Sequence, residues 1–262
     1  MKLSANLIEE QNFHNAWVKA IRAVLRGTDL VIGGGDERKA VRESCVLISM
    51  TGNAIKQIEA RELHPQYRFR RIEEYCNEFT REFLEEYRSK PVNERFSYLY
   101  FERLAYYEAT SRSRFRSNHG NSNSNSNSNS NSSSSFDQII SLKTALADQI
   151  NQNITSNRTQ AITWYVPSDI KQSSPPCLQR IQIRYVPEKS VDVHLTWRSR
   201  DLFTAWQSNI VCIIEMLNRE VIKPNNCQIV RIIDYSDSLH IYRYDIEDAK
   251  KLDFVPAFPG VV

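Results

Sequence analysis

The chain has 262 residues, 41% of them apolar, which is enough for one large domain with a buried core. Lys and Arg total 34 against 31 Asp and Glu, and this net charge of +3 excludes the polyelectrolyte character of a nucleic-acid-coating protein. No apolar run reaches the roughly 18 residues that a membrane-spanning helix needs, and the start, MKLSANLIEEQNF, carries acids where a signal peptide has its apolar core. We therefore expect a cytoplasmic protein with neither nucleic acid nor membrane as partner.

Five cysteines are scattered along the chain, at Cys45, Cys76, Cys177, Cys212 and Cys227. Their number is odd and no two form a CxxC pair, a pattern that favours neither a disulfide framework nor a structural zinc site. We therefore expect five free thiols in a reducing compartment, and no bound metal.

The first apolar pattern in the chain has helical spacing. Apolar residues recur every three or four positions up to Gly27, which predicts an amphipathic helix over residues 12–26. The next stretch, LVIGGGDERKAVRESCVLISM, places three glycines between two β-prone runs and predicts a hairpin. These glycines also offer backbone that could approach a phosphate, although they form no GxGxxG motif ahead of a helix.

The middle of the chain combines a charged helical pattern with a low-complexity tract. Apolar residues between Tyr67 and Arg88 have helical period, with acids and bases interleaved on the outer face, so a helix is predicted there. Residues 117–135 are almost purely Asn and Ser, and such a tract cannot bury enough apolar area to offset its chain entropy. We expect a disordered insertion within a single domain spanning residues 1–262, because neither flank alone contains a complete site.

The second half of the chain alternates helical and strand patterns. IISLKTALADQI predicts a helix, while AITWYV, RIQIRYV and VDVHLTWR predict strands. In the last of these, alternate residues fall on one face: Val191, Val193, Leu195 and Trp197. Another helix is predicted from about Phe203 to Glu220, followed by the strand QIVRII and the segment SLHIYRYDI. The alternation favours an α/β fold whose large sheet, mostly antiparallel or mixed, is flanked by helices.

Cys177 differs from the other cysteines in its local sequence. It follows two prolines at the mouth of a predicted strand, a rigid place that we expect to be exposed. Because structural thiols are usually buried, this position favours a functional thiol, and an inert thiol is the alternative.

A second group of polar residues begins at Arg198. This arginine ends a predicted strand, and Ser199 and Asp201 fall where the following helix is expected to begin. A guanidinium, a hydroxyl and helix N-terminal amides can together hold a phosphate, although the same residues could simply cap the helix. Asn209 lies two helical turns further on, where its amide could read a pyrimidine edge by donating and accepting at once, or could be incidental.

Together these segments resemble the thymidylate synthase family. The resemblance rests on PPC with Cys177, on RSRD, on Asn209 eleven residues after Arg198, and on HIY with His240 and Tyr242. These elements follow one another in the family's order. The resemblance implies the α/β (α+β) thymidylate synthase fold, a single domain with a large bent mixed sheet flanked by helices, and a homodimer formed through the sheet face.

The resemblance implies catalytic roles for three residues. Cys177 matches the family nucleophile, which adds to C6 of dUMP so that C5 can attack the one-carbon unit of 5,10-methylenetetrahydrofolate and give dTMP. Asp201 matches an aspartate of the hydrogen-bond network around pyrimidine and folate. Tyr100 in LYFERL looks like the family tyrosine near the nucleophile, although Phe101 replaces the glycine that usually follows it.

Other matched residues imply nucleotide binding. Arg198 and Ser199 match residues that hold the phosphate, and a cation beside the thiol favours its reactive thiolate form. Asn209 matches the asparagine that selects uracil over cytosine, while His240 and Tyr242 match residues that bond the deoxyribose hydroxyl.

Arginines outside these motifs are expected to complete the phosphate site. SNRTQAITWYVPSD is similar to the family segment whose arginines reach the partner's phosphate across the dimer interface, and it retains Arg158 where two consecutive arginines are usual. Nearer the N-terminus, Arg38 and Arg42 both lie in the general region of a phosphate-binding loop, and the sequence does not choose between them.

The chain also departs from the family pattern. Leu178 follows Cys177 where bacterial members have histidine, which is similar to the archaeal, methanogen-type branch. The tryptophan-rich folate loop and long C-terminal portion of bacterial members have no counterpart. Three residues match the catalytic glutamate equally loosely: Glu73, Glu74 and Glu78.

These departures leave two alternatives to dUMP methylation. A looser, wetter site would let water add after carbon transfer, which would make the protein a (d)UMP or (d)CMP 5-hydroxymethylase using the same folate donor. The second alternative is a catalytically silent nucleotide-binding or interaction protein of the same fold. Retention of Cys177 argues against a silent protein.

Overall fold

The computed structural model describes residues 5–32, 39–68, 71–109 and 134–254, and its largest element is one mixed sheet. The strands of this sheet are β1 (Ala5–Glu10), β2 (Thr28–Ile32), β3 (Lys39–Thr51), β6 (Gln160–Ile162), β7 (Leu178–Val186), β8 (Ser190–Trp197), β9 (Arg200–Asp201) and β10 (Gln228–Tyr242). They follow the order β1-β3-β10-β8-β7-β6, with β2 paired to β3 and β9 paired to β10. The β1–β3, β10–β8 and β10–β9 pairs are parallel and the others antiparallel, so the predicted mixed sheet is confirmed.

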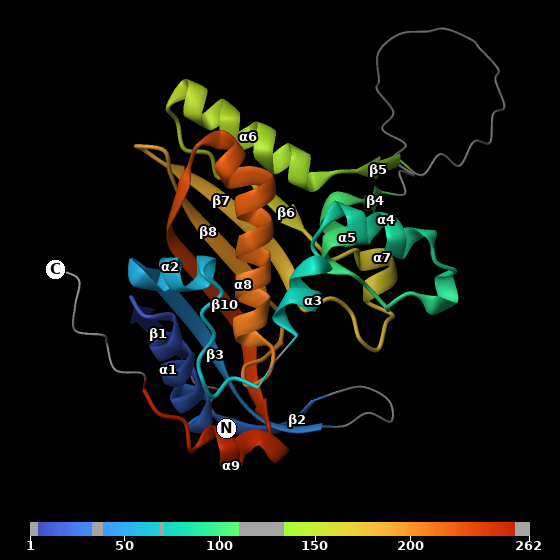
Figure 1. The fold of residues 1–262 in the computed structure, drawn as a ribbon. Helices are drawn as coiled ribbons and strands as arrows, with labels where there is room; N and C mark the ends of the chain where they lie inside the picture. The colour runs from blue at the N-terminus through green and yellow to red at the C-terminus, as the bar shows by residue number, and fades with distance from the viewer. Residues whose placement is uncertain (1–4, 33–38, 69–70, 110–133, 255–262) are drawn as a thin grey trace, which may run out of the picture.

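Helices flank this sheet, as the sequence predicts. They are α1 (Phe13–Leu25), α2 (Asn53–Glu59), α3 (Ile72–Asn77), α4 (Arg81–Ser89), α5 (Tyr100–Ala105), α6 (Gln138–Gln152), α7 (Val166–Asp169), α8 (Trp206–Leu217) and α9 (Ile246–Ala249). Figure 1 shows α8 running across the face of the sheet, with α1 and α2 on the same side. Two short strands, β4 (Tyr107–Ala109) and β5 (Ser134–Phe136), pair separately beside α5.

Helix α1 confirms the first predicted element. The Asn12 side chain accepts a hydrogen bond from the backbone N–H of Asn15 and so caps the helix start. The chain turns at Gly27, where an added Cβ would lie 2.1 Å from the backbone oxygen of Glu43. Only glycine lets β3 approach the end of α1 this closely.

The predicted hairpin is also found. Strand β2 pairs with β3 antiparallel, with Thr28 opposite Glu43 and Ile32 opposite Lys39. The glycine-rich turn proposed as a phosphate contact, together with Arg38, lies in residues 33–38, outside the described part of the chain.

The single helix predicted between Tyr67 and Arg88 is wrong in its extent, because the segment forms two helices. Helix α3 ends at Asn77, and α4 begins at Arg81. Thr80 separates them in an extended conformation, and its hydroxyl accepts from the backbone N–H of Phe83. A residue that caps a new helix competes with continuation of the old one, and periodicity alone does not show this.

In the second half, β7, β8 and α8 confirm their predictions, and the four apolar residues predicted on one face of β8 are fully buried. The predicted strand AITWYV is shorter than expected. It leaves the sheet after Ile162, since Asp169 accepts a bond from the backbone N–H of Tyr165 and draws the chain into α7. The segments QIVRII and SLHIYRYDI share one long strand, β10, whose register shifts between Ser236 and Leu239.

The Asn/Ser-rich tract predicted over residues 117–135 lies mostly outside the described residues, which resume at Ser134. Its last two residues, Ser134 and Ser135, belong to β5, so the predicted boundary was too late. Strand β5 pairs with β4, which precedes the tract in the sequence. The two flanks of the tract therefore meet in one small sheet.

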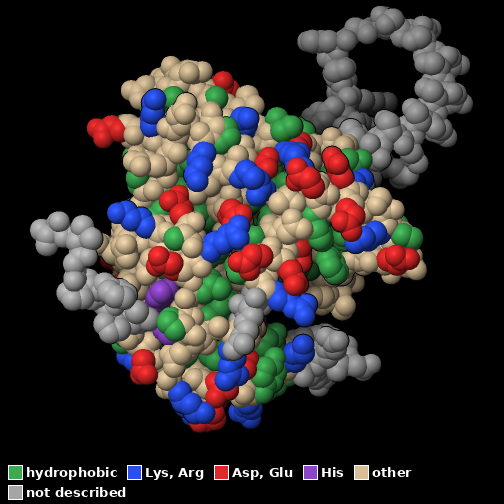
Figure 2. All heavy atoms as spheres, viewed as in Figure 1, with side chains coloured by type: hydrophobic (Ala, Val, Ile, Leu, Met, Phe, Trp, Pro, Cys, Tyr) green, Lys and Arg blue, Asp and Glu red, His purple; other side chains and the backbone are tan. Residues whose placement is uncertain are grey.

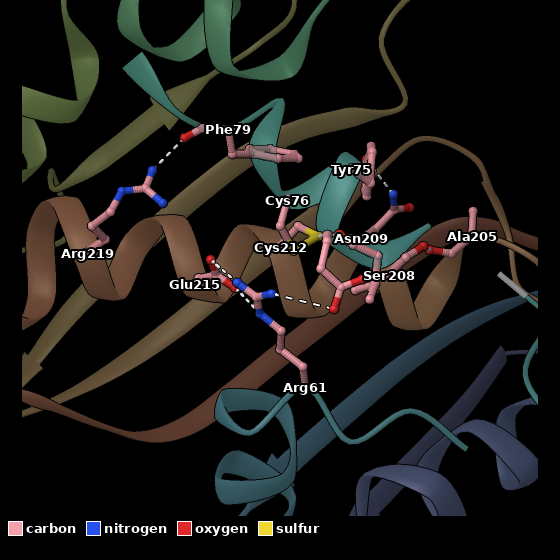
Figure 3. The surroundings of a disulfide bond; sticks show 12 residues. Arg61, Tyr75, Cys76, Phe79, Ala205, Ser208, Asn209, Cys212, Glu215 and Arg219 are labelled. Atoms are coloured by element: carbon pink, nitrogen blue, oxygen red, sulfur yellow. Dashed lines mark hydrogen bonds and ion pairs between the residues drawn. A yellow bond between two sulfur atoms is a disulfide. The ribbon is translucent and has the colours of Figure 1, made fainter. Parts of the chain in front are cut away.

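The expectation of five free thiols is wrong. Cys76 in α3 and Cys212 in α8 form a disulfide across 136 residues of sequence (Figure 3). Cys45, Cys177 and Cys227 are free. The pair has no sequence signature because it depends on the packing of α3 against α8, and the argument for a reducing compartment from unpaired cysteines no longer holds.

The face drawn in Figure 2 carries acidic and basic side chains that are interspersed, in agreement with the near-balanced charge. Across the described ranges, no helix combines the length and the apolar character that crossing a bilayer requires.

Candidate active site

A cavity of about 1270 Å³ opens between the hairpin β2–β3, the α3 end, the segment before α5, the loop before β7 and the start of α8. All but one of the residues predicted for the site line it: Tyr100, Cys177, Arg198, Ser199, Asp201, Asn209, His240 and Tyr242. The exception is Arg158, which is exposed and lies outside the lining. A site scattered over more than a hundred residues of sequence is thus gathered in one place.

Cys177 and Arg198 meet at one end of this cavity. The Cys177 thiol is half-buried, and Nη2 of Arg198 lies 3.6 Å from its sulfur. The same guanidinium donates to the backbone carbonyls of Pro175 and Pro176, at 2.6 Å and 3.0 Å. The backbone N–H of Arg198 donates to the carbonyl of Cys177. The rigid proline turn and the arginine therefore hold each other, with a cation at the sulfur.

Two tyrosines lie behind the thiol. The Tyr100 hydroxyl accepts a bond from the backbone N–H of Leu178, and it lies 3.4 Å from the Tyr98 hydroxyl. Burial raises the pKa of both phenols, with the nearby Cys177 as a further cause, so both remain protonated at neutral pH. Sequence reasoning missed Tyr98, although its two-residue spacing from Tyr100 in an extended segment places both on one face.

Ser199, His240 and Tyr242 form the wall opposite α3. The Ser199 hydroxyl lies 3.4 Å from Nδ1 of His240, and the rings of His240 and Tyr242 meet edge to face. His240 is only 3% exposed, and burial lowers its pKa, which favours the neutral imidazole. Its Nε2 has no hydrogen-bond partner among the described residues, so the cavity presents a buried imidazole nitrogen for a ligand hydroxyl.

The predicted helix start at Ser199 and Asp201 is wrong. Residues 200–201 form β9, which pairs with β10, and α8 begins only at Trp206. Asp201 instead accepts bonds from the backbone N–H groups of Phe203 and Thr204, and from the Thr204 hydroxyl. Helix amides are therefore not aimed at Ser199, and the carboxylate fixes a turn, which is close to the capping alternative.

Asn209 lines the same cavity, lies on the first turn of α8 and is 9% exposed. Its amide Nδ2 donates to the Tyr75 hydroxyl at 2.7 Å (Figure 3), and its Oδ1 accepts from Nε of Arg200 at 3.2 Å. Tyr75 and Arg200 line the same cavity. Sequence reasoning gave neither residue a role: Tyr75 lies in no motif, and Arg200, although part of RSRD, is identified only by its contacts.

The structure distinguishes the three loosely matched glutamates. Glu78, at the end of α3, lines the cavity, whereas Glu73 and Glu74 do not, and their side chains are 73% and 71% exposed. Burial raises the pKa of Glu78, which keeps its proton to higher pH than an ordinary glutamate. Glu78 is therefore the glutamate of the three that can act on a ligand in the cavity.

Of the two N-terminal arginines considered for phosphate binding, Arg42 is engaged elsewhere. Its guanidinium pairs with Asp29 at 2.8 Å and donates to the backbone oxygen of Leu25, and it does not line the cavity. Lys39, three residues earlier on β3, does line it, with its ammonium 5.6 Å from the centre of the Tyr242 ring. Within the described ranges, no cluster of three or more His, Cys, Asp or Glu side chains is arranged to hold a metal ion.

Comparison with known proteins agrees with this geometry. The family model described as "Thymidylate synthase" matches residues 80–253, more than half of the chain, and this match includes every site residue named above except those from β2, β3 and α3. The chain belongs to the thymidylate synthase family.

A curated protein from Methanopyrus kandleri (strain AV19), with the printed name "Putative thymidylate synthase", is 22% identical to the chain over 105 residues. The match covers 40% of this chain and 50% of that protein, so the chain spans about half the length of this curated relative. The relative comes from a methanogen, the group that the sequence resemblance pointed to.

Proposed function

We propose that this protein is a thymidylate synthase that converts dUMP to dTMP through a covalent bond between Cys177 and C6 of the pyrimidine. The observation that carries the proposal is the pair of Cys177 and Arg198, 3.6 Å apart in a cavity that the Asn209 amide also lines. A thiolate, a cation and a base-reading amide within one cavity are what C6 addition to a pyrimidine nucleotide requires.

The chain's own residues supply the first half of the reaction. The Cys177 sulfur forms a bond to C6, and the C5–C6 double-bond electrons move toward the C4 oxygen, which makes C5 nucleophilic. Burial raises the pKa of Glu78, so this side chain retains its proton to higher pH than an ordinary glutamate, and its protonated form can donate to the C4 oxygen as negative charge develops there. Arg198 and Ser199 bind the phosphate, and His240 and Tyr242 bind the sugar hydroxyl.

The cavity fits a folate beside the nucleotide. Its volume of about 1270 Å³ exceeds the upper value of about 1,000 Å³ for a site that holds one drug-sized ligand. Phe96, which is 58% exposed, and Tyr242 present aromatic rings to this space, where a flat ring system can stack. When bound, 5,10-methylenetetrahydrofolate supplies the one-carbon unit and the hydride that reduces it to a methyl group.

We further propose a homodimer that joins through the open sheet face, with Arg158 reaching the phosphate of the partner. Arg158 is exposed and lies outside the cavity of its own chain. Arg184 Nε on β7 and His194 Nε2 on β8, which share one face of the sheet, are buried without hydrogen-bond partners among the described residues. A second copy packed on this face would supply acceptors for them.

One observation favours nucleotide hydroxymethylation as a second candidate. The last described residues pack away from the cavity: the Asp253 carbonyl bonds His64, and the Phe254 ring lies under the Arg22 guanidinium. None of these residues lines the cavity. A cavity not covered by this segment admits water, which would capture the transferred carbon as a 5-hydroxymethyl group.

The test is a covalent adduct with 5-fluoro-dUMP and 5,10-methylenetetrahydrofolate, measured by mass spectrometry. The wild type forms the adduct and Cys177→Ser does not, whereas Cys45→Ser, which removes another half-buried free thiol, retains it. Absence of an adduct in the wild type would refute the proposal. Release of tritium from C5-tritiated dUMP measures turnover, and identification of the product as a 5-methyl or 5-hydroxymethyl nucleotide decides between the two candidates. A mixture of Arg158→Ala and Cys177→Ala chains recovers activity only if each site is shared between two chains.

A further inference from the structure

We infer that Arg200 is a positioning residue that sets base specificity, because it holds the Asn209 amide in the orientation that presents an N–H donor to the cavity. The inference rests on the proposed function, in which Asn209 reads the pyrimidine. Arg200 occupies the one position of the RSRD segment to which the sequence assigned no role, and its guanidinium points into the protein.

The Arg200 guanidinium is fixed on all sides. Its side chain is 1% exposed, as is that of Asp234 on β10, to which Nη1 donates at 2.8 Å and 3.0 Å. Nη2 donates to the backbone oxygen of Trp206 at 2.8 Å, and the Trp197 ring lies 3.9 Å from the guanidinium carbon. A group held by an ion pair, a carbonyl and an aromatic face has little freedom to rotate.

Asp234 is in turn held by two indoles. The Trp197 Nε1–H donates to one carboxylate oxygen at 2.8 Å, and the Trp206 Nε1–H donates to the other at 2.7 Å. The buried charge pair is therefore fully engaged, which is the condition for tolerating charges in a protein interior. This network places the Nε–H of Arg200 against Oδ1 of Asn209.

The direction of that last bond determines what Asn209 shows to a ligand. Nε–H can only donate, so it donates to Oδ1 of the amide and repels the amide NH₂. Turning the amide by half a rotation would set two donors against each other inside the protein and would also break the bond from Nδ2 to Tyr75. The NH₂ group must therefore face Tyr75 and the cavity.

A fixed donor distinguishes the two natural pyrimidines at C4. Uracil carries an oxygen there, which accepts from the Asn209 NH₂ group, whereas cytosine carries an amino group, which also donates. An amide free to rotate could turn its oxygen toward the amino group of cytosine, but an amide fixed by Arg200 cannot. Sites that leave a buried donor unpaired with the wrong ligand discriminate strongly.

The experiment compares dUMP with dCMP, by dissociation constants from calorimetry and by rates of tritium release from C5. Arg200→Lys retains the positive charge for Asp234 but lacks the Nε donor, so we expect the preference for dUMP to fall at least tenfold. Asp234→Asn is the matched control: it weakens the same buried pair and lowers the melting temperature, but it keeps the Nε donor of Arg200 and the bond from Nη2 to the Trp206 carbonyl, so the preference should fall much less than in Arg200→Lys. Equal loss in both variants would show a merely structural pair and overturn the inference.

If Arg200→Lys does not fold, a second variant tests the same point. Arg200→Met combined with Asp234→Asn removes both charges and keeps an acceptor for the indoles, and it too should relax the preference. If every Arg200 variant prefers dUMP as strongly as the wild type does, the inference is overturned, but the proposed function is not. A wild type that binds neither nucleotide, by contrast, overturns the proposed function itself.

Discussion

Two groups of residues that line the cavity are held in different ways, and we call them the thiol end (Cys177 and Arg198) and the amide end (Asn209, Tyr75 and Arg200). At the thiol end, Cys177 is half-buried, and Arg198 is anchored by the backbone carbonyls of Pro175 and Pro176, the two residues before Cys177. At the amide end, Asn209 is fixed by Tyr75 and Arg200, side chains from other elements that are themselves held by buried partners.

This difference separates reactivity from recognition. Backbone contacts at the thiol end leave the sulfur accessible and place a charge beside it, which suits a nucleophile. The buried network at the amide end allows one orientation of one amide, which suits discrimination between bases. Substitutions at the thiol end should therefore change rates, whereas substitutions at the amide end should change affinity and selectivity.

Glu78 gives the largest expected effect, because it lies at the amide end yet is proposed to act in the chemistry. General acids contribute about 10²- to 10⁴-fold to rate, so Glu78→Gln should form the 5-fluoro-dUMP adduct about 10³-fold more slowly. Burial raises the pKa of Glu78, and the protonated donor is lost as pH rises through that pKa. The ratio of the wild-type rate to the variant rate should therefore fall with increasing pH.

Stopped-flow measurement of adduct formation across the pH range checks this expectation. Taking the ratio cancels every pH dependence that is common to both proteins. Glu74→Gln is the matched control, since Glu74 is exposed and lies outside the cavity. A pH-independent ratio would assign Glu78 a binding role only.

The disulfide gives the next largest effect, on stability. Joining α3 to α8 across 136 residues restricts the unfolded chain, and such cross-links stabilise by about 2–4 kcal/mol. Cys76→Ser with Cys212→Ser should lower the midpoint of urea unfolding accordingly, whereas Cys227→Ser, which removes a buried free thiol, tests the effect of substitution alone.

This double variant also tests the comparison between the two ends. Tyr75 and Glu78 flank Cys76, and Asn209 lies one helical turn before Cys212, so loosening the link should weaken dUMP binding. The rate at which iodoacetamide alkylates Cys177 should stay the same. A change in that rate would show that the two ends are coupled.

At the thiol end, Arg198→Lys should slow adduct formation about 30-fold, because lysine keeps the charge but not the fork of donors that binds two carbonyls and the sulfur. Adduct kinetics at saturating nucleotide measure this loss. Arg219→Lys, which alters an arginine bonded to the backbone oxygen of Phe79 outside the cavity, should behave as the wild type. Unaltered kinetics in Arg198→Lys would show that charge alone is sufficient.

The smallest effect is expected for Tyr75→Phe. It removes the acceptor of one Asn209 N–H, and a single hydrogen bond of this kind contributes about 1 kcal/mol, so dUMP should bind a few-fold more weakly. The preference for dUMP over dCMP should remain, since Arg200 still fixes the amide. Calorimetry with both nucleotides measures each quantity, and loss of the preference would assign the positioning role to Tyr75.

The same contrast explains what the sequence could predict. Cys177, Arg198, Asn209 and His240 were found because each lies in a short motif with fixed spacing, and β8 was found because its apolar residues alternate. The mixed sheet with flanking helices followed from such patterns. Short motifs and periodic patterns were therefore enough to predict the residues of the thiol end and most of the sheet and its flanking helices.

The remaining features depend on contacts between distant residues. Arg200 meets Asp234 across 34 positions, and Cys76 meets Cys212 across 136, so neither pair leaves a local signal. The break between α3 and α4 and the late start of α8 have a different cause. Thr80 and Asp201 bond backbone N–H groups that a longer helix would have used, and periodicity does not register that competition.

Gly27 shows how far the demands of the cavity reach. It touches no ligand, yet its backbone lies so close to the Glu43 carbonyl that even one methyl group would push β3 outward. Glu43 and Lys39 on that strand form part of the cavity wall. The absence of a Cβ at Gly27 thus helps to set the width of the cavity. Natural variation at this position should be as restricted as variation among the residues that contact the nucleotide.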